Sequence, residues 1–336
     1  MRKFLLILFV SLMGLANAKE RILVQTPYET AVYDMESKKQ LATFPGTYQS
    51  VALDQENGLV YLARGEVMPK DFRYITDLKG FDLKSNQIVM TFSFEKVGVP
   101  DNPYLLAVAS KKQQAYLINN SSGELLVFDL SNKVQSDSIP LKGMPESIVI
   151  SPDEKNLVAI NSSSNSLSVI SLDSHREYLT IPTEATPNHA VFSMDGRKIF
   201  FSQDNGTIVL FDLLFKRTIA KIPVGNNPKK LTMSPDGNTI YAVWEGAYGQ
   251  KGVSIVDVKK NAKIGDSSCQ LIMAGDPKDC VFNTDSTRAY CLVSLEYNTV
   301  ITLDNDGVAD CEPECIEVNF ASYPGLPYYS IHLIHD

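Results

Sequence analysis

The fold is decided by the stretch at residues 186–225, TPNHAVFSMDGRKIFFSQDNGTIVLFDLLFKRTIAKIPVG. It contains four short runs rich in β-branched and aromatic residues, at 188–193, 197–203, 207–212 and 217–223. Turn residues separate these runs, first Met-Asp-Gly and then Asp-Asn-Gly. Runs of this length and composition predict strands, and the separators are typical of hairpin turns. The stretch therefore predicts a sheet of four antiparallel strands.

The same unit recurs along the chain, each time opened by a proline: Pro103, Pro145, Pro187, Pro228, Pro277 and Pro327. The turn after the first strand recurs as Ser-Pro-Asp-Glu at 151–154, Ser-Met-Asp-Gly at 193–196 and Ser-Pro-Asp-Gly at 234–237. Proline presets φ for such a turn, and aspartate caps it through its side chain. An acidic residue ends the third strand of six units: Asp34, Asp82, Asp129, Asp212, Asp257 and Asp304, with Ser171 in the same place in the remaining unit.

Seven third strands indicate seven units of about 45 residues each, the size of a four-stranded propeller blade. The first unit has only three strands, at 21–26, 30–34 and 40–44, and the last unit is followed by one extra strand near 328–334. We therefore predict an all-β, seven-bladed propeller that is closed by the C-terminal strand pairing into the N-terminal blade. Closure removes the exposed sheet edges that an open array would leave.

The units resemble the YVTN-type β-propeller repeat, and the residues that carry the resemblance best are 225–237, 240–243 and 254–257. The resemblance covers nearly the whole chain after residue 18 and is weaker in units one to three and seven. It implies an exported prokaryotic scaffold. The functions within that family are too varied to assign any site residue here.

Residues 1–18 have the features of a secretion signal. Arg2 and Lys3 precede a short apolar run at 4–15, and Ala16-Asn17-Ala18 is a small-x-small cleavage site. The apolar run is too short to span a bilayer. We therefore expect a signal peptide at 1–18, one propeller domain at 19–336 and a periplasmic or secreted protein with no membrane insertion.

The charge of the chain is acidic, with a formal net charge of −8. Removal of Arg2 and Lys3 with the signal would make it −10. An acidic surface repels phosphate backbones, so we expect no nucleic-acid partner. We expect a monomer that binds a protein or a glycan.

Two of the loops between second and third strands are enlarged, at 65–78 and 245–252. Both are expected on the same rim of the propeller, where loops on a rigid scaffold can bind a partner. Their aromatic and charged residues are the predicted binding residues: Phe72, Arg73, Tyr74, Trp244, Glu245 and Tyr248. Two alternatives remain open: Trp244, the only tryptophan, can instead wedge between blades, and the larger loops can be neutral insertions.

The run at 304–310, DNDGVAD, has oxygen ligands on alternate residues and a glycine, as calcium loops do. Asp304, Asp306 and Asp310 are its candidate ligands, and calcium is the candidate metal; we expect no other cofactor for a binding scaffold. The run lacks the glutamate that an EF-hand has at its twelfth position. Ordinary turn chemistry explains the same residues, so a structural role is the alternative.

All five cysteines lie late in the chain: Cys269, Cys280, Cys291, Cys311 and Cys315. The turn at 283–287 would place Cys280 opposite Cys291 in a hairpin, and Cys311 and Cys315 lie close together in C-E-P-E-C. We predict these two local disulfides with Cys269 left over; the alternative pairs Cys269 with Cys311 or Cys315. The motifs for a zinc site or a covalently attached haem are absent from the sequence.

Motifs for catalysis are few. The chain has four histidines, of which His189 and His332 fall on predicted innermost strands and could meet a ligand at the centre of the ring. The sequence therefore favours a non-catalytic binding scaffold. The alternative is a propeller enzyme acting at the channel mouth, a lactonase-like hydrolase or a cofactor-dependent dehydrogenase, and a third option is an adhesion or surface-layer module.

Overall fold

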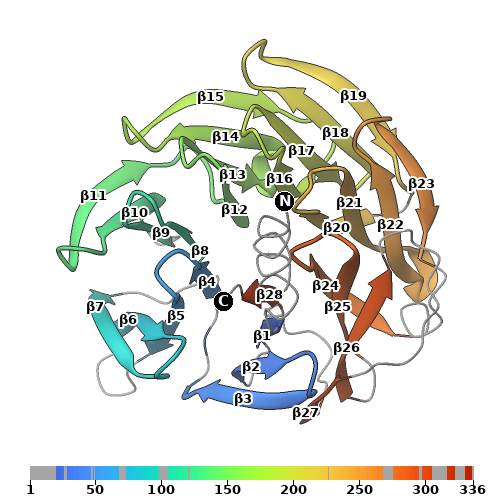
Figure 1. Cartoon of the computed structure of the whole chain (residues 1–336). Coiled ribbons are helices and arrows are strands. Elements are labelled where there is room, and N and C mark those ends of the chain that lie inside the picture. The colour runs from blue at the N-terminus through green and yellow to red at the C-terminus, as the bar shows by residue number, and fades with distance from the viewer. Residues whose placement is uncertain are drawn as a thin grey trace, which may run out of the picture.

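The computed structural model describes residues 20–25, 29–46, 48, 50–67, 73–97, 105–119, 122–225, 227–267, 275–294, 297–304, 316–321 and 330–334. These residues form seven four-stranded sheets, and the sheets are arranged as blades around a ring (Figure 1). Neighbouring strands within each blade are antiparallel. The seven-bladed propeller predicted from the repeat is therefore confirmed.

The blades are numbered here in chain order, and the first-named strand of each is innermost. Blade 1 comprises β28 (Ser330–Ile334), β1 (Arg21–Gln25), β2 (Thr30–Asp34) and β3 (Lys39–Phe44), and blade 2 comprises β4 (Ser50–Asp54), β5 (Leu59–Val67), β6 (Arg73–Asp82) and β7 (Ile88–Val97). Blade 3 comprises β8 (Leu106–Ala109), β9 (Gln114–Asn119), β10 (Glu124–Asp129) and β11 (Val134–Pro140). Blade 4 comprises β12 (Ser147–Ile150), β13 (Asn156–Asn161), β14 (Ser166–Ser171) and β15 (Arg176–Pro182).

Blade 5 comprises β16 (Pro187–Phe192), β17 (Lys198–Gln203), β18 (Thr207–Asp212) and β19 (Arg217–Pro223). Blade 6 comprises β20 (Asn227–Met233), β21 (Thr239–Glu245), β22 (Lys251–Asp257) and β23 (Ala262–Asp266). Blade 7 comprises β24 (Asp276–Phe282), β25 (Arg288–Ser294), β26 (Tyr297–Asp304) and β27 (Ile316–Ala321). Two short 3₁₀ turns, η1 (Ser162–Ser164) and η2 (Ala247–Gly249), connect strands of blades 4 and 6.

The acidic residue at the end of the third strand builds the turn that follows it, as predicted. The Asp212 carboxylate accepts the backbone N–H groups of Leu214 and Phe215, both at 2.9 Å. In blade 4 the Ser171 hydroxyl accepts the N–H of Ser174 at 3.3 Å in the same way. These bonds satisfy turn donors that have no partner in the sheet, which explains why the residue recurs.

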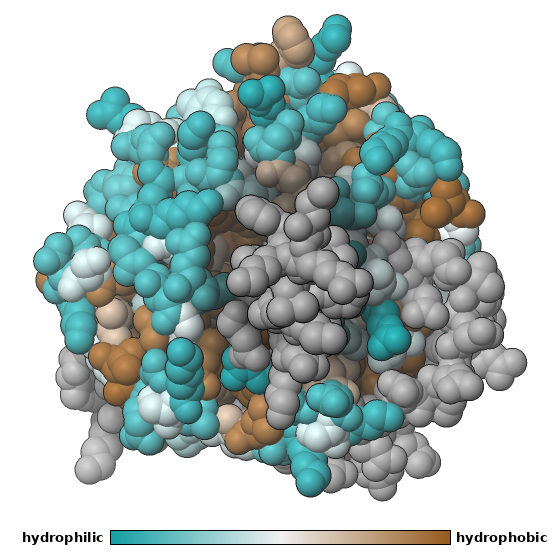
Figure 2. Space-filling view, in the orientation of Figure 1, coloured by the Kyte–Doolittle hydropathy of each residue, from teal (hydrophilic) through white to brown (hydrophobic). Residues whose placement is uncertain are grey.

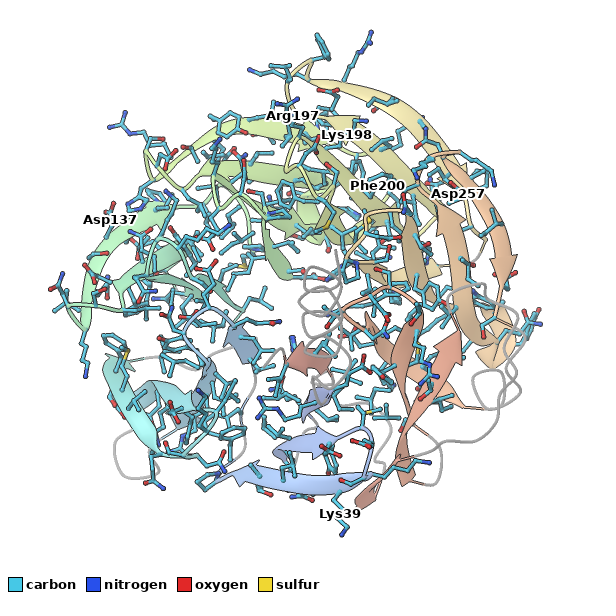
Figure 3. All side chains as sticks on the ribbon, viewed as in Figure 1. Lys39, Asp137, Arg197, Lys198, Phe200 and Asp257 are labelled. Carbon is cyan, nitrogen blue, oxygen red and sulfur yellow. A yellow bond between two sulfur atoms is a disulfide. The ribbon has the colours of Figure 1, made fainter. Side chains whose placement is uncertain are left out.

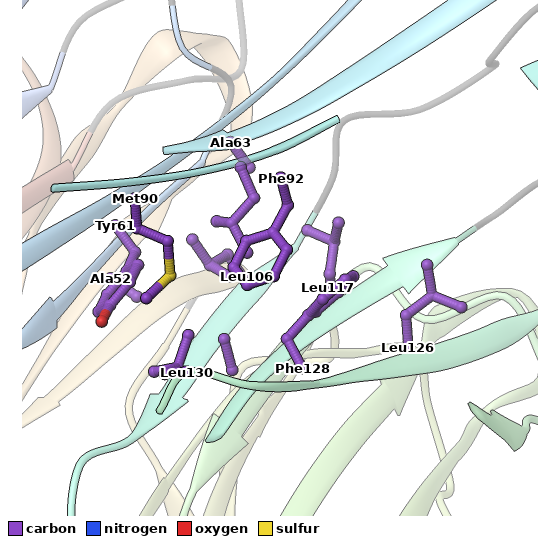
Figure 4. Close-up of a cluster of buried hydrophobic side chains, with 12 residues drawn as sticks. Ala52, Tyr61, Ala63, Met90, Phe92, Leu106, Leu117, Leu126, Phe128 and Leu130 are labelled. Atoms are coloured by element: carbon purple, nitrogen blue, oxygen red, sulfur yellow. The ribbon is translucent and has the colours of Figure 1, made fainter. Parts of the chain in front are cut away.

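The core lies between the blades, where each sheet face packs against its neighbour. One buried cluster joins blades 2 and 3 through Tyr61, Phe92, Leu117 and Phe128 (Figure 4). Corresponding clusters join the other neighbouring blades. In Figure 3, Phe200 lies within the wall between blades 5 and 6, whereas Lys39 on an outermost strand points away from the ring. Burying each large apolar side chain stabilises the fold by roughly 1.5–3 kcal/mol.

The ring closes through the two ends of the chain. β28 pairs with β1 and becomes the innermost strand of blade 1. Gln55 of blade 2 also donates from Nε2 to the Leu333 carbonyl at 3.0 Å. The predicted extra strand near 328–334 is thus confirmed over Ser330–Ile334; residues 328 and 329 lie outside the described part of the chain.

The prediction of a long loop at 65–78 was wrong. β5 and β6 stay paired out to Val67 and Tyr74, so most of this segment is a long two-stranded ribbon. The aromatic and β-branched residues Tyr74, Ile75 and Thr76 favour a strand, which explains why this segment continues the sheet. Asp77 joins Arg64 across this ribbon in an ion pair at 3.1 Å.

Candidate functional site

One rim of the propeller carries the turns between second and third strands together with the connections between blades. We call it the connection rim. On this rim an open hollow of about 430 Å³ lies between blades 5 and 6. Its lining comes from the β17–β18 turn, the β19–β20 connection and the β21–β22 turn: Asp204, Asn205, Asn227, Glu245, Gly246 and Ala247.

The blade 5 side of the hollow is a tight hairpin turn. Gly206 has φ of 83°, a conformation that favours glycine and lets the chain reverse directly after Asn205. The Asp204 carboxylate accepts the N–H of Thr186 at 3.2 Å, and the Thr207 hydroxyl donates to the Asn205 side chain at 2.6 Å. These bonds fix the two polar side chains of the turn relative to the blade.

A side chain of blade 5, Asn188, fixes the β19–β20 connection between blades 5 and 6. The Asn188 amide donates to the Asn227 side-chain oxygen at 2.8 Å and to the Pro228 carbonyl at 2.9 Å. On the blade 6 side, the Glu245 carboxylate lies 4.0 Å from the Lys251 ammonium. Lys251 is itself closer to Asp276, at 2.5 Å. The hollow therefore presents carboxylate and amide oxygens, and Lys251 lies closer to Asp276 than to the Glu245 carboxylate of the hollow.

Two of the predicted aromatic residues flank the hollow. Tyr248 in η2 is fully exposed at 104% and has a positive φ of 59°. Trp244 is half-buried, and its ring lies across Gly252 of the paired strand, where a Cβ would come within 2.6 Å of the ring. The indole Nε1 is buried and has no hydrogen-bond partner among the described residues. Trp244 is thus held mainly by packing within its own blade.

The predicted residues of blade 2 are not brought to this hollow. Arg73 and Tyr74 are placed in β6, on the other side of the ring from β21, and Phe72 lies outside the described residues. Of the six predicted binding residues, the structure therefore gathers Trp244, Glu245 and Tyr248 around one site. Asp204, Asn205 and Asn227 were missed because single turn residues of this kind also occur in turns with no binding role.

The calcium and cysteine predictions are only partly covered by the structure. Asp304 ends β26, and Asp306 and Asp310 lie outside the described residues. In the described part of the chain, no group of three or more His, Cys, Asp or Glu side chains could hold a metal ion. The predicted Cys280–Cys291 disulfide is confirmed, and the two residues are directly paired across β24 and β25. Cys269, Cys311 and Cys315 also lie outside the described residues.

A second group of polar side chains lies on the innermost strands. Two positions of each innermost strand lie two residues apart and therefore on the same face of the strand, and we call these positions the inner wall. The first position holds Ser50, Leu105, Ser147, His189, Lys230 and Asp279 in blades 2 to 7; the second holds Ala52, Ala107, Val149, Val191, Thr232, Val281 and, in blade 1, His332. Ionisable side chains are thus confined to blades 5, 6, 7 and 1.

The surface in the orientation of Figure 1 is largely hydrophilic, with apolar side chains near the outer edge (Figure 2). Leu214 and Phe215, 73% and 67% exposed, are among the exposed apolar residues of the outer part of blade 5. They follow the third strand and therefore lie on the rim opposite the hollow. The Arg217 guanidinium lies over the Phe215 ring, 5.5 Å from its centroid.

Solved structures share the fold at low sequence identity. A putative 6-phosphogluconolactonase from Bacteroides fragilis matches with a TM-score of 0.69 and 16% identity, over 95% of this chain and 98% of that one. The dihydro-heme d1 dehydrogenase NirN, solved in complex with DHE, matches with a TM-score of 0.62 and 14% identity, over 87% of this chain and 72% of that one. Hydrazine synthase from Kuenenia stuttgartiensis matches with a TM-score of 0.55 and 17% identity, over 62% of this chain and 65% of that chain.

No curated protein matches the sequence. At these identities the solved structures show a common propeller fold and carry no activity over to this chain. A family model for the cytochrome D1 heme domain matches residues 152–319, which are 168 of the 336 residues. The matched segment covers blades 5 and 6 and most of blades 4 and 7. It therefore contains the residues of the hollow and most of the ionisable residues of the inner wall. The chain belongs to the cytochrome D1 heme domain family.

Proposed function

We propose that the protein is a non-catalytic binding scaffold that contacts a protein or glycan partner through the connection rim at blades 5 and 6. The observation that carries this proposal is the hollow lined by Asp204, Asn205, Asn227 and Glu245. Its two carboxylates and two side-chain amides offer acceptors to the hydroxyl groups of a sugar or to the amine and amide donors of a protein.

The aromatic residue at the edge of the hollow supports the same function. Tyr248 exposes its whole ring, and a positive φ costs energy for a residue of this kind. An exposed tyrosine gives a large contact area, and its hydroxyl can hydrogen-bond to the partner. Trp244 beside it is packed on Gly252, so we assign Trp244 to support of the turn and Tyr248 to contact with the partner.

The rigidity of the lining favours binding. Side-chain and backbone bonds already fix Asp204, Asn205 and Asn227. A preorganised site loses less conformational entropy when a partner binds than a loose loop does. We therefore expect binding to change side-chain contacts at this rim with little movement of the blades.

Export is part of the proposal. The residues at 1–18 have the charge, length and cleavage pattern of a signal peptide, which supports a periplasmic or secreted location for the YVTN-type repeats. The Cys280–Cys291 disulfide supports an oxidising compartment. In the described part of the chain, no helix has the length and apolar character that a membrane span requires.

The family name implies a haem, and His189 and Lys230 of the inner wall do not fit one. A histidine that ligates iron normally donates its other ring N–H to an acceptor. His189 has the reverse arrangement, because its Nδ1 accepts the N–H of Leu231 at 3.3 Å. The proton of the neutral ring is then on Nε2, the nitrogen that would have to bind the metal. Lys230 is the only cation at the described inner-wall positions, whereas a haem carries two or more carboxylates. No step of the proposed function uses a haem.

The proposal is tested by capture from solubilised native envelope and on a glycan array, with immobilised protein. We expect Glu245→Gln and Tyr248→Ala each to weaken capture at least about fivefold, which corresponds to about 1 kcal/mol. Both residues are exposed, so the melting temperature should stay unchanged.

A matched control is Tyr178→Ala, which removes another exposed tyrosine from the outermost strand of blade 4. It should leave capture unchanged. Equal capture by wild type and by the Glu245→Gln/Tyr248→Ala double variant would show that the partner uses another surface.

A further inference from the structure

The inner wall carries ionisable groups at one equivalent position in three successive blades. His189, Lys230 and Asp279 each lie two residues after the proline that is the first or second residue of the innermost strand. The same position in blades 2, 3 and 4 holds Ser50, Leu105 and Ser147. Since a single repeat pattern generates all of these positions, the ionisable residues are a departure from the repeat and are not needed to form a blade.

Asp279 is a fixed carboxylate. Its side chain is 6% exposed and accepts the backbone N–H of Cys280 at 2.9 Å. Burial raises the pKa of Asp279, and the charge of Lys230 and a hydrogen bond from the backbone of Ile331 in β28 oppose this rise. A carboxylate in such a place costs stability unless it is compensated. It is therefore held by donors from blades 6, 7 and 1.

Lys230 is the more accessible member of the pair. Its side chain is 33% exposed, and its Nζ lies 3.6 Å from the Asp279 carboxylate, longer than a good hydrogen bond. A lysine ammonium has three N–H donors, and the described residues engage it at this one contact. Lys230 therefore has donors left for a ligand on the inner wall.

His189 supplies a second donor beside Lys230. Because its Nδ1 accepts the N–H of Leu231, the residue next to Lys230, the neutral ring carries its proton on Nε2. That Nε2–H has no hydrogen-bond partner among the described residues. Burial, and then the Lys230 charge, lower the pKa of His189 well below its usual value, so the ring is neutral at neutral pH.

The geometry points to a binding site for a small monocarboxylate on the inner wall, where the ligand carboxylate accepts from Lys230 Nζ and His189 Nε2. Asp279 positions the lysine. Two N–H donors match the two oxygens of a carboxylate, whereas the Asp279 charge beside Lys230 disfavours a ligand with two negative charges such as a phosphate dianion. The site is separate from the rim hollow, and it does not depend on the function proposed for that hollow.

The probe is sodium acetate, added to the purified protein, with sodium chloride at equal ionic strength as the reference. Long-range proton–nitrogen NMR of the imidazole rings gives the readout, since the chain has only four histidines. We expect acetate to shift the His189 Nε2 signal saturably in the wild type. Lys230→Met should weaken this response at least about tenfold, because a charge-assisted hydrogen bond is lost.

Lys229→Met is the matched control, since it removes the exposed lysine next in the sequence and should bind acetate as the wild type does. Lys230→Met leaves Asp279 buried without its lysine, so a Lys230→Met/Asp279→Asn double variant removes both charges together and should also lose the response. The site is ruled out if the wild type shows no saturable shift specific to acetate. It is equally ruled out if either folded variant lacking Lys230 responds with wild-type affinity.

Discussion

Leu23 in β1 is paired with His332 in β28, so residues 309 positions apart in the sequence lie side by side in blade 1. This pairing closes the ring between blades 7 and 2. The stability of the whole domain therefore depends on the last residues of the chain. Because His332 lies in this strand, we also expect that stability to depend on pH.

Removal of residues 327–336 should strongly destabilise the protein. β28 buries Ile331, Leu333 and Ile334, each less than 5% exposed, and supplies one edge of β1 with hydrogen bonds. At roughly 1.5–3 kcal/mol for each buried side chain, the loss should be about 5 kcal/mol or more. Thermal unfolding followed by circular dichroism measures it, and an unchanged melting temperature would contradict the closure.

Gly252→Ala should displace the only tryptophan. A Cβ at position 252 would lie 2.6 Å from Trp244 Cζ2 and 2.9 Å from Cε2, so the ring has to move. We expect the free energy of unfolding to fall by about 1–3 kcal/mol and the tryptophan fluorescence to change. Gly265→Ala is the control, because a Cβ there meets nothing within 4 Å. If both variants behave alike, the packing of Trp244 on Gly252 is wrong.

His332 should make the protein less stable in acid. Burial, followed by the charge of Lys230, lowers the pKa of His332 from 6.5 to about 4. Between these values the unfolded chain binds a proton at this residue and the folded protein does not. The free energy of unfolding should therefore fall as the pH drops from 6.5 towards 4, by at most about 3 kcal/mol from this residue.

Urea unfolding of wild type and His332→Gln across this pH range tests the assignment. The difference in unfolding free energy between the two proteins should shift in favour of the variant as the pH falls. His189 titrates in the same direction and remains in both proteins, so it cancels in the comparison. A difference that stays constant with pH would remove His332 as the cause.

The Cys280–Cys291 disulfide should contribute measurable stability. Its cysteines are 11 residues apart, so the bond closes a short loop in the unfolded chain. The entropy model gives about 2–3 kcal/mol for a loop of this size. Cys280→Ala/Cys291→Ala should lower the urea midpoint accordingly. With a reductant present, the wild type should lose most of its advantage; an equal midpoint for both proteins in oxidising buffer would argue against this contribution.

The fold could be predicted from the sequence because its signals are local. The proline, the Ser-Pro-Asp-Gly turn and the closing aspartate each determine a hairpin with a few neighbouring residues, and their repetition gives the number of blades. The Cys280–Cys291 pair followed from the turn at 283–287, which sets the register of β24 and β25. The extra C-terminal strand followed from counting the strands of blade 1.

The candidate sites depend on contacts between blades, which no local pattern records. In the sequence, Lys230 and Asp279 are two charged residues on separate predicted strands. Only the closed ring brings them close to each other and to His189. Asn227 belongs to a connection whose position is set by Asn188 in the previous blade. The extent of the β5–β6 ribbon was also missed, because turn-like and strand-like residues alternate there and the sheet pairing decides between them.

Hydrogen–deuterium exchange with and without the captured partner tests the binding rim most directly. We expect slower exchange in the two turns of the hollow, at residues 203–207 and 245–251, and no change in the Ser-x-Asp-Gly turns at 193–196 and 234–237 on the opposite rim. Slower exchange confined to those opposite turns, with the hollow unaffected, would contradict it.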